Sequence, residues 1–144
     1  MTGVQTCALP IFRQSDIAAD GHAIEARILA EDPDRNFAPS PGRITQWLAP
    51  RGEGVRVDTA MEVGASVPPF YDSMIAKLIV HAADRPGAVA RLRDALEQFQ
   101  ISGLATNLRL LRAIVGHRDF IEGRFDTRWL DTVLLPSFVE RRNS

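Results

Sequence analysis

The sequence predicts an α+β fold, in which a mainly antiparallel sheet is followed by two to three helices. Two observations support this prediction. Apolar residues alternate with polar ones in the segments between Gly21 and His81, which is the period of a β-strand. From Asp84 onward they recur at intervals of three and four, which is the period of a helix. Because the strands come first and the helices afterwards, the pattern favours α+β over an alternating α/β arrangement.

The clearest strand is predicted between His22 and Glu31. One set of its side chains is mostly apolar and faces a core, while the other set carries charge and faces elsewhere. Pro33 ends this strand, because proline cannot donate a hydrogen bond to a strand ladder. The inward set is His22, Ile24, Ala26, Ile28 and Ala30, and further strands are expected over 44–48, 55–58 and 73–81, with extended backbone at Val67-Pro68-Pro69.

Two helices are predicted in the second half, with a short third helix near 127–134. Asp84 is the expected N-cap of the first helix. Thr106 or Asn107 is expected to cap the second, and Gly116 suits the C′ position just after its end. The predicted core stripes are Val89, Leu92, Leu96 and Phe99 on the first helix, and Leu108, Leu111, Ile114 and Val115 on the second.

Length and composition narrow the class of protein. With 144 residues and a net charge of −1, the chain fits one domain with its own core and lacks the basic surplus that binds nucleic acid. No apolar run approaches the ~18 residues that suggest a membrane span. The single cysteine, Cys7, excludes an internal disulfide and a multi-cysteine metal site, so a cytoplasmic location is the default expectation.

The chain is expected to divide into three segments: a leader over 1–13, one domain over 14–135, and a tail over 136–144. The leader lacks the basic start of a signal peptide, and much of it resembles translated sequencing-adapter sequence. We therefore expect it to be non-native or disordered, with Leu9 and Ile11 outside the main core.

Most short motifs with possible chemistry fail on inspection. His117-Arg118-Asp119 resembles a kinase catalytic loop, but Arg124 stands where that loop needs asparagine. Gly52-Glu53-Gly54 lacks the third glycine of a dinucleotide-binding fingerprint. The three histidines have none of the spacing that zinc sites use, so we expect His22, His81 and His117 to be structural or surface residues, and we predict no metal site.

One pair, Glu25 and Arg27, survives on physical grounds. The two residues are separated by two positions on the first strand, so they share its polar face, roughly 6.5–7 Å apart. They form either an exposed ion pair of little energetic weight or an arginine held toward a cleft to fix an anion. Lys77 is the only lysine among 17 basic residues, a bias that fits either genomic codon usage or an arginine-rich anion site.

Several linked motifs resemble the biotin carboxylase C-terminal domain. The match starts at Gly21-His22-Ala23-Ile24-Glu25-Ala26-Arg27-Ile28 and Ala30-Glu31-Asp32-Pro33, and it continues through Pro39-Ser40-Pro41-Gly42, Gly54-Val55-Arg56 and the run Val67-Pro68-Pro69-Phe70-Tyr71-Asp72-Ser73-Met74-Ile75-Ala76-Lys77-Leu78. It closes at Thr106-Asn107 and Phe125-Asp126-Thr127. Position 70 is phenylalanine where the family usually has tyrosine.

The resemblance implies a ligase reaction in which ATP and Mg²⁺ activate bicarbonate, and biotin on a separate carrier is then carboxylated. It assigns Arg27 to the active site, where it contacts bicarbonate and stabilises the developing enolate at the biotin ureido oxygen. It places Arg56 near a homodimer interface, although a plain surface role remains open. The implied partners are an ATP-binding lobe, a biotin carboxyl carrier domain and a carboxyltransferase.

The family's nucleotide-binding and metal-binding segments have no counterpart in this sequence. We therefore expect a truncated piece that binds no cofactor and has no activity alone, with ATP and Mg²⁺ bound in the missing lobe. A stand-alone module for dimerisation or carrier docking is the alternative. The parent's substrate, an acyl-CoA or pyruvate, stays open. A lobe of this kind should expose apolar side chains to its missing half, and Trp47, Val67, Pro69 and Phe70 are the candidates.

Overall fold

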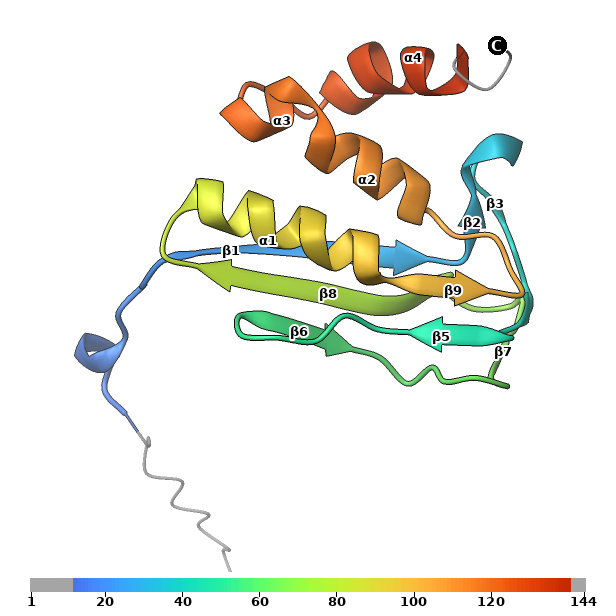
Figure 1. The fold of residues 1–144 in the computed structure, drawn as a ribbon, viewed down its shortest axis with the longest axis horizontal. Helices are drawn as coiled ribbons and strands as arrows, with labels where there is room; N and C mark the ends of the chain where they lie inside the picture. The colour runs from blue at the N-terminus through green and yellow to red at the C-terminus, as the bar shows by residue number, and fades with distance from the viewer. Residues whose placement is uncertain (1–11, 141–144) are drawn as a thin grey trace, which may run out of the picture.

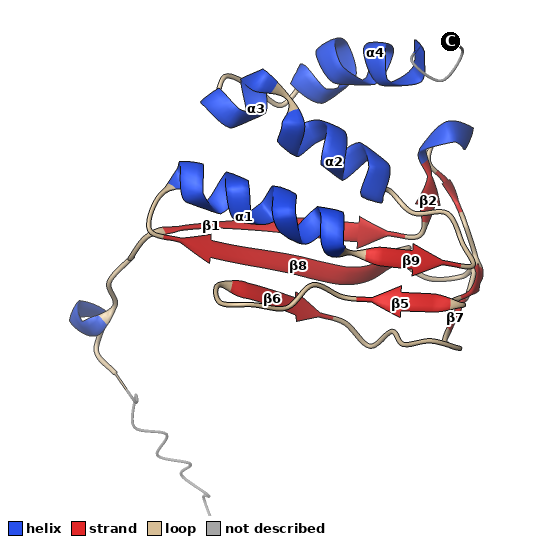
Figure 2. Cartoon of the chain, viewed as in Figure 1, coloured by secondary structure: helices blue, strands red, loops and turns tan. Residues whose placement is uncertain are grey.

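A computed structural model describes residues 12–140 of the chain and confirms the α+β fold. The main sheet has three antiparallel strands in the order β1-β8-β6, and helix α1 lies across one of its faces, as Figure 1 and Figure 2 show. Helices α2, α3 and α4 form a further layer beyond α1 (Figure 1). Leu9 and Ile11 lie outside the described residues, so their packing stays a prediction.

All strands except β9 come before the α-helices in the chain, while one short 3-10 turn precedes the strands and another lies among them. The strands of the main sheet are β1 (His22–Leu29), β6 (Val55–Asp58) and β8 (Met74–Ala82). Three two-stranded sheets pair β2 (Glu31–Asp32) with β3 (Ala38–Pro39), β4 (Gly42–Arg43) with β7 (Ser66–Val67), and β5 (Gln46–Leu48) with β9 (Gln100–Ser102). The helices are η1 (Gln14–Asp16), η2 (Pro33–Arg35), α1 (Arg85–Gln98), α2 (Leu108–Gly116), α3 (Arg118–Glu122), η3 (Leu130–Leu134) and α4 (Leu135–Glu140).

The core lies between α1 and the inward face of β1 and β8. Ile28 of β1 and Leu78 and Val80 of β8 have no exposed surface, and the strand alternation predicted for β1 is confirmed. On α1, the predicted stripe of Val89, Leu92, Leu96 and Phe99 is buried. Each such side chain stabilises the fold by about 1.5–3 kcal/mol relative to leaving it exposed, so this seam holds the sheet and helix together.

The ends of the helices follow the sequence prediction only in part. The Asp84 carboxylate accepts a hydrogen bond from the backbone N–H of Gly87 at 2.8 Å, so the predicted cap of α1 is confirmed. Asn107 precedes α2, but its side chain makes no capping bond. Gly116 is the last residue of α2 and does not have the positive φ of a C′ glycine, so that prediction was wrong.

The C-terminal region differs from the single short helix predicted near 127–134. Helix α3 comes before it, and η3, a π-helical turn, runs directly into α4, which continues past position 136, where the tail was expected to begin. These elements pack on α2 through a second apolar cluster that includes Leu110, Trp129 and Leu134. The short α3 was not predicted because five residues carry too little periodicity to detect.

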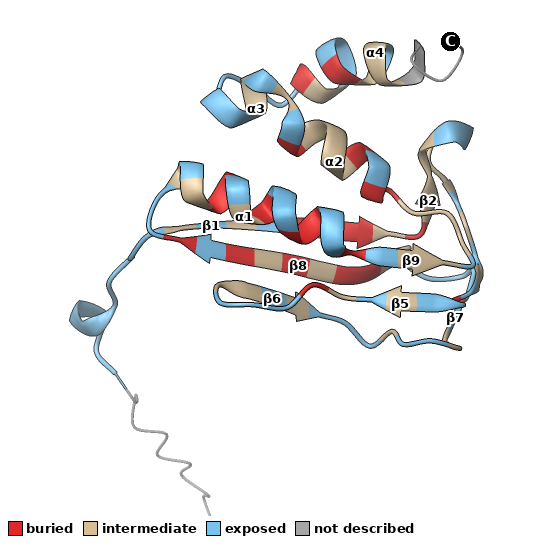
Figure 3. Cartoon of the chain, viewed as in Figure 1, coloured by how far each residue is buried: buried red, intermediate tan, exposed pale blue. Residues whose placement is uncertain are grey.

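Two of the four apolar residues that were expected to be exposed are exposed in the structure. Phe70 is 85% exposed, and Pro69 beside it is also exposed. Figure 3 shows that buried residues are found instead along α1 and β8. The prediction was wrong for Val67, which is only 7% exposed because β7 pairs with β4 over the core. Trp47 is half-buried, with its ring edge-on to Phe99 at 5.4 Å. Tyr71, which was not a candidate, is 82% exposed.

Two glycines give a matched test of this fold. A Cβ at Gly103, where φ is +103°, would lie 2.1 Å from the Arg43 carbonyl oxygen, whereas one at Gly116 meets nothing within 4 Å. We expect Gly103→Ala to lower the free energy of unfolding by at least ~1–3 kcal/mol. Gly116→Ala should leave it unchanged or raise it by up to ~1 kcal/mol, since alanine favours a helix. Urea denaturation measures both, and equal destabilisation by the two variants would contradict the described loop.

Candidate functional site on the uncovered sheet face

The face of the main sheet that points away from α1 carries most of the charge. Directly opposed residues of an antiparallel sheet share a face, and Arg27 of β1 lies opposite Lys77 of β8, which lies opposite Asp58 of β6. In the next row Glu25 lies opposite Ile79, which lies opposite Arg56. The two predicted site residues, Arg27 and Arg56, therefore occupy one face, on the two outer strands.

Glu25 and Arg27 form the ion pair that their spacing predicted. The Nε–H of Arg27 donates to Oε1 of Glu25 at 3.0 Å, and the two side chains are 65% and 41% exposed for Arg27 and Glu25 respectively. A guanidinium has five N–H donors, and this contact uses only one of them. The donors on the two Nη atoms have no hydrogen-bond partner within residues 12–140, so they can bind an oxyanion.

The positive side chains on this face favour both the ionised form of Glu25 and the binding of an anion. The hydrogen bond from Arg27 holds the pKa of the Glu25 carboxyl below its ordinary value, and the positive charges of Lys77, Arg27 and Arg56 act in the same direction. Lys77 and Arg27 are like charges on directly opposed residues, a placement that is unfavourable by itself. An anion bound between or above them would relieve that repulsion.

The backbone beneath Arg27 is fixed by Asn107, from the start of α2. Its Nδ2 donates to the carbonyl oxygen of Arg27 at 3.0 Å, and its Oδ1 accepts from the N–H of Leu29 at 2.9 Å. Asn107 is 6% exposed, the one buried polar residue among those that the structure describes. Its amide thus bonds the outer edge of β1 as a neighbouring strand would, which explains why it leaves α2 uncapped.

A cavity of about 410 Å³ runs along the same edge of β1, between the strand and the helices. Leu92 and Leu96 of α1 and Leu111 and Ile114 of α2 form part of its apolar wall. Glu25, Arg27, Glu31 and Asn107 contribute its polar atoms. The site therefore has a charged face on one side of β1 and an apolar space at its edge.

Arg56 is paired within its own strand. Its Nε lies 3.1 Å from Oδ1 of Asp58, and its side chain is 70% exposed. Lys77, Asp58 and Asn107 were not predicted from the sequence to belong to this site. Alternation along 73–81 could have put Lys77 on the polar face, but only the strand register shows that it stands opposite Arg27.

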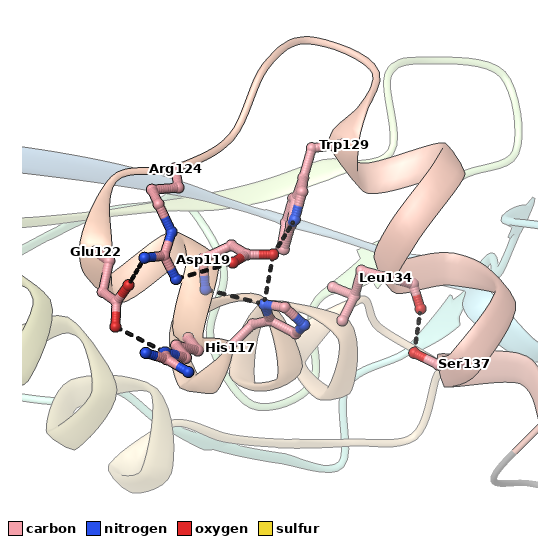
Figure 4. A network of polar contacts seen from close by, with 8 residues as sticks. His117, Asp119, Glu122, Arg124, Trp129, Leu134 and Ser137 are labelled. Carbon is pink, nitrogen blue, oxygen red and sulfur yellow. Dashed lines mark hydrogen bonds and ion pairs between the residues drawn. The ribbon is translucent and has the colours of Figure 1, made fainter.

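A second polar network, drawn in Figure 4, joins α3 to η3. The indole N–H of Trp129 donates to Oδ2 of Asp119 at 3.1 Å, a bond that lowers the pKa of the Asp119 carboxyl. Nδ1 of His117 accepts from the backbone N–H of Asp119 at 3.1 Å, and Arg124 approaches the same carboxylate. Asp119 is thus used in packing, and His117, like His81 with its 2.8 Å contact to the Asp20 carbonyl, has a structural role as predicted.

Within the part of the chain that the structure describes, no group of three metal-binding side chains comes together. No helix between residues 12 and 140 has both the length and the apolar composition to cross a membrane.

The family model of the biotin carboxylase C-terminal domain matches residues 25–132. The chain belongs to this family. The match includes Arg27, Arg56, Lys77 and Asn107, and it confirms the resemblance seen in the sequence. The polar face of the sheet is thus a feature of a biotin carboxylase C-terminal domain.

Similar proteins include biotin carboxylases and subunits of other carboxylases. The domain is 47% identical to biotin carboxylase 1 of Bacillus subtilis over 121 residues, covering 84% of this chain and 27% of that protein. It is 48% identical over 120 residues to the 2-oxoglutarate carboxylase small subunit of Hydrogenobacter thermophilus, covering 83% and 25%. With the alpha subunit of soybean methylcrotonoyl-CoA carboxylase the identity is 39% over 137 residues, covering 95% and 19%. The chain spans about a quarter or less of these proteins.

Solved structures share the fold. The biotin carboxylase domain of a thermophilic 2-oxoglutarate carboxylase, bound to bicarbonate, superposes with a TM-score of 0.82 at 47% identity, over 85% of this chain and 28% of that one. A complete multifunctional pyruvate carboxylase of Rhizobium etli gives 0.80 at 39% identity, over 85% and 12%.

The ion pair of this domain can be tested by titration. We expect the Glu25 carboxyl to titrate below its ordinary pKa, and Arg27→Met to raise that pKa by removing the main hydrogen bond. Since the folded pKa is the lower one, the pair stabilises the fold above the pKa of the unfolded chain, and this contribution is lost as the pH falls through the folded pKa. NMR of the side-chain carboxyl carbon measures the shift. A titration unaffected by Arg27→Met would contradict the described pair.

Proposed function

We propose that this domain supplies Arg27 to the carboxylation of carrier-bound biotin, driven by ATP and bicarbonate in the intact enzyme. The observation that supports this is the geometry of Arg27. Its backbone is clamped by Asn107, its Nε is bonded to Glu25, and its Nη donors face open space on a cationic surface. The bicarbonate-bound structure of a relative 47% identical to this chain supports the same class of anion.

The residue type fits the chemistry. Removing the proton from the ureido nitrogen of biotin places negative charge on the ureido oxygen. A guanidinium remains cationic at working pH, so Arg27 can stabilise this charge and hold the singly charged bicarbonate, but it cannot act as the base. Its planar set of donors also matches the geometry of a carboxylate-like oxyanion.

The remaining parts of the reaction belong to other segments of the enzyme. Residues 12–140 contain no cluster of acidic side chains able to hold Mg²⁺, and no phosphate-binding glycine loop. We therefore assign ATP and Mg²⁺ to an ATP-binding lobe of the intact enzyme. The partners are that lobe, a biotin carboxyl carrier domain and a carboxyltransferase.

The variety among the relatives indicates which step this domain serves. Their names specify 2-oxoglutarate, pyruvate and methylcrotonoyl-CoA as the carboxylated compounds. A domain retained at 39–48% identity across such different acceptors serves the step common to all, which is carboxylation of biotin. Choice of acceptor, whether acyl-CoA or keto acid, is assigned to the carboxyltransferase.

Replacement of Arg27 in a full-length carboxylase carrying this domain tests the proposal. Arg27→Ala should slow biotin carboxylation by on the order of 10²–10³, since a fixed donor to a developing oxyanion is lost. Arg27→Lys should recover only part of the rate, because a point charge cannot reproduce the planar donors. ATP affinity should not change, and stability should stay within about 0.5 kcal/mol because the side chain is exposed.

Steady-state carboxylation of free biotin, nucleotide binding and thermal melting are the measurements. A near-normal carboxylation rate in Arg27→Ala would leave the exposed ion pair as the better account of Glu25 and Arg27.

We further propose that Arg56 contributes to a homodimer contact in the intact enzyme. Its side chain is 70% exposed on strand β6, the outer strand opposite β1. The biotin carboxylase domain of the Hydrogenobacter enzyme, 47% identical, was solved as a dimer. Arg56→Glu should weaken dimerisation at least ~10-fold, since a reversed charge at an interface is costly. Analytical ultracentrifugation of the full-length enzyme measures this, with Arg27→Ala as the control that stays dimeric.

A further inference from the structure

We propose that Glu25 is a positioning residue, which acts through Arg27 by fixing the direction of its guanidinium. This inference rests on the proposed function of Arg27 and extends it to a second residue. The relevant observations are the single contact between the two side chains, the position of Lys77, and the absence of a second hydrogen-bond partner for Glu25 within the described residues.

The contact selects one atom of the guanidinium. Oε1 of Glu25 accepts from Nε of Arg27 at 3.0 Å, close to the base of the planar group. A carboxylate bound there restrains rotation of the guanidinium and leaves the four donors on the two Nη atoms available. A contact through the Nη atoms would instead have consumed the donors that an oxyanion needs. The pair thus orients Arg27 without blocking it.

Lys77 makes this restraint necessary. It stands directly opposite Arg27 on β8, so the two positive side chains repel each other. The carboxylate in the same row as Arg27 and Lys77 is Asp58, which lies on the far side of Lys77 and pairs with Arg56 at 3.1 Å. Without Glu25, no carboxylate would lie beside Arg27 on β1, and repulsion by Lys77 would set the direction of the guanidinium.

Stability does not account for the pair. Both side chains are more than two-fifths exposed, and exposed ion pairs contribute little to the free energy of unfolding. Among residues 12–140, Glu25 accepts no other hydrogen bond. A carboxylate of this kind has its main effect on the placement of the neighbouring cation.

The test uses Glu25→Ala and Glu25→Gln in the full-length carboxylase that carries this domain. Glu25→Ala should lower kcat for biotin carboxylation by roughly 10- to 100-fold, because small misplacement of a catalytic group is costly. Glu25→Gln keeps an oxygen acceptor for Nε and should retain a larger share of the rate. The KM for ATP and the melting temperature should not change in either variant.

Glu122→Gln is the matched control. Glu122 accepts from Nε of Arg118 at 2.8 Å on α3, so the chemical change is the same at a site away from the sheet face. Its carboxylation rate should stay at the wild-type level. A loss equal to that of Glu25→Gln would show a general effect of surface charge and overturn the proposal.

A double-mutant cycle separates this proposal from the role of Arg27. If Glu25 acts through Arg27, Glu25→Ala combined with Arg27→Ala should be no slower than Arg27→Ala alone. Additive losses would mean that Glu25 acts independently, and the positioning role would fall. A slow Arg27→Ala with a wild-type Glu25→Ala would also reject it while leaving the function of Arg27 intact. A wild-type rate in Arg27→Ala would reject the proposed function itself.

Discussion

The buried amide of Asn107 is the contact on which the arrangement of this domain depends. It bonds the N–H of Leu29 and the carbonyl of Arg27, and so joins the edge of β1 to the start of α2. A buried amide left without such partners would destabilise the fold by about 1–3 kcal/mol, so the two elements are strongly tied. One side chain therefore closes the strand edge, docks the second helix layer and fixes the backbone that carries Arg27.

The two faces of the main sheet have different roles: one packs in the core and the other carries the charged side chains of the candidate site. The inner face is packed against α1 with residues such as Ile28 and Leu78 that have no exposed surface. The outer face of the sheet carries the exposed Arg27 and Arg56, on β1 and β6, and the half-buried Lys77 on β8. Because alternate residues of one strand serve the two faces, the rigidity of the core is transmitted directly to the charged side chains. The backbone that carries the charged side chains is therefore held in place by the core, although these side chains are not themselves in the core.

The sequence was sufficient for several features that depend on local patterns. Alternation predicted β1 and the outward direction of Arg27, and the 55–58 strand was predicted with the correct ends. The N-cap Asp84 was correct because a cap acts within one turn of helix. The motif resemblance identified the family, which periodicity alone could not do.

Other features depend on contacts between distant segments. Asn107 was expected to cap α2, but its side chain bonds residues about 80 positions earlier in the chain. The opposition of Arg27 and Lys77 depends on register, and the short β9 exists only because Trp47 and its neighbours pair with it. Val67 was expected on the surface because a proline-rich segment gives no sign of the strand that covers it. In each case the deciding partner lies far away in sequence.

The distance between Asn107 and β1 also constrains how the domain can form during synthesis. Strand β1 is made before both of its partners, since β8 begins only at Met74 and the amide that closes its other edge follows 78 residues after Leu29. Translation proceeds at roughly 5–20 residues per second, so β1 waits several seconds with both edges open. An unpaired strand containing Ile24 and Ile28 is a template for pairing with other chains during that interval. The charges of Glu25 and Arg27 on the same strand then have an additional benefit, since they keep the nascent strand hydrated until its partners emerge.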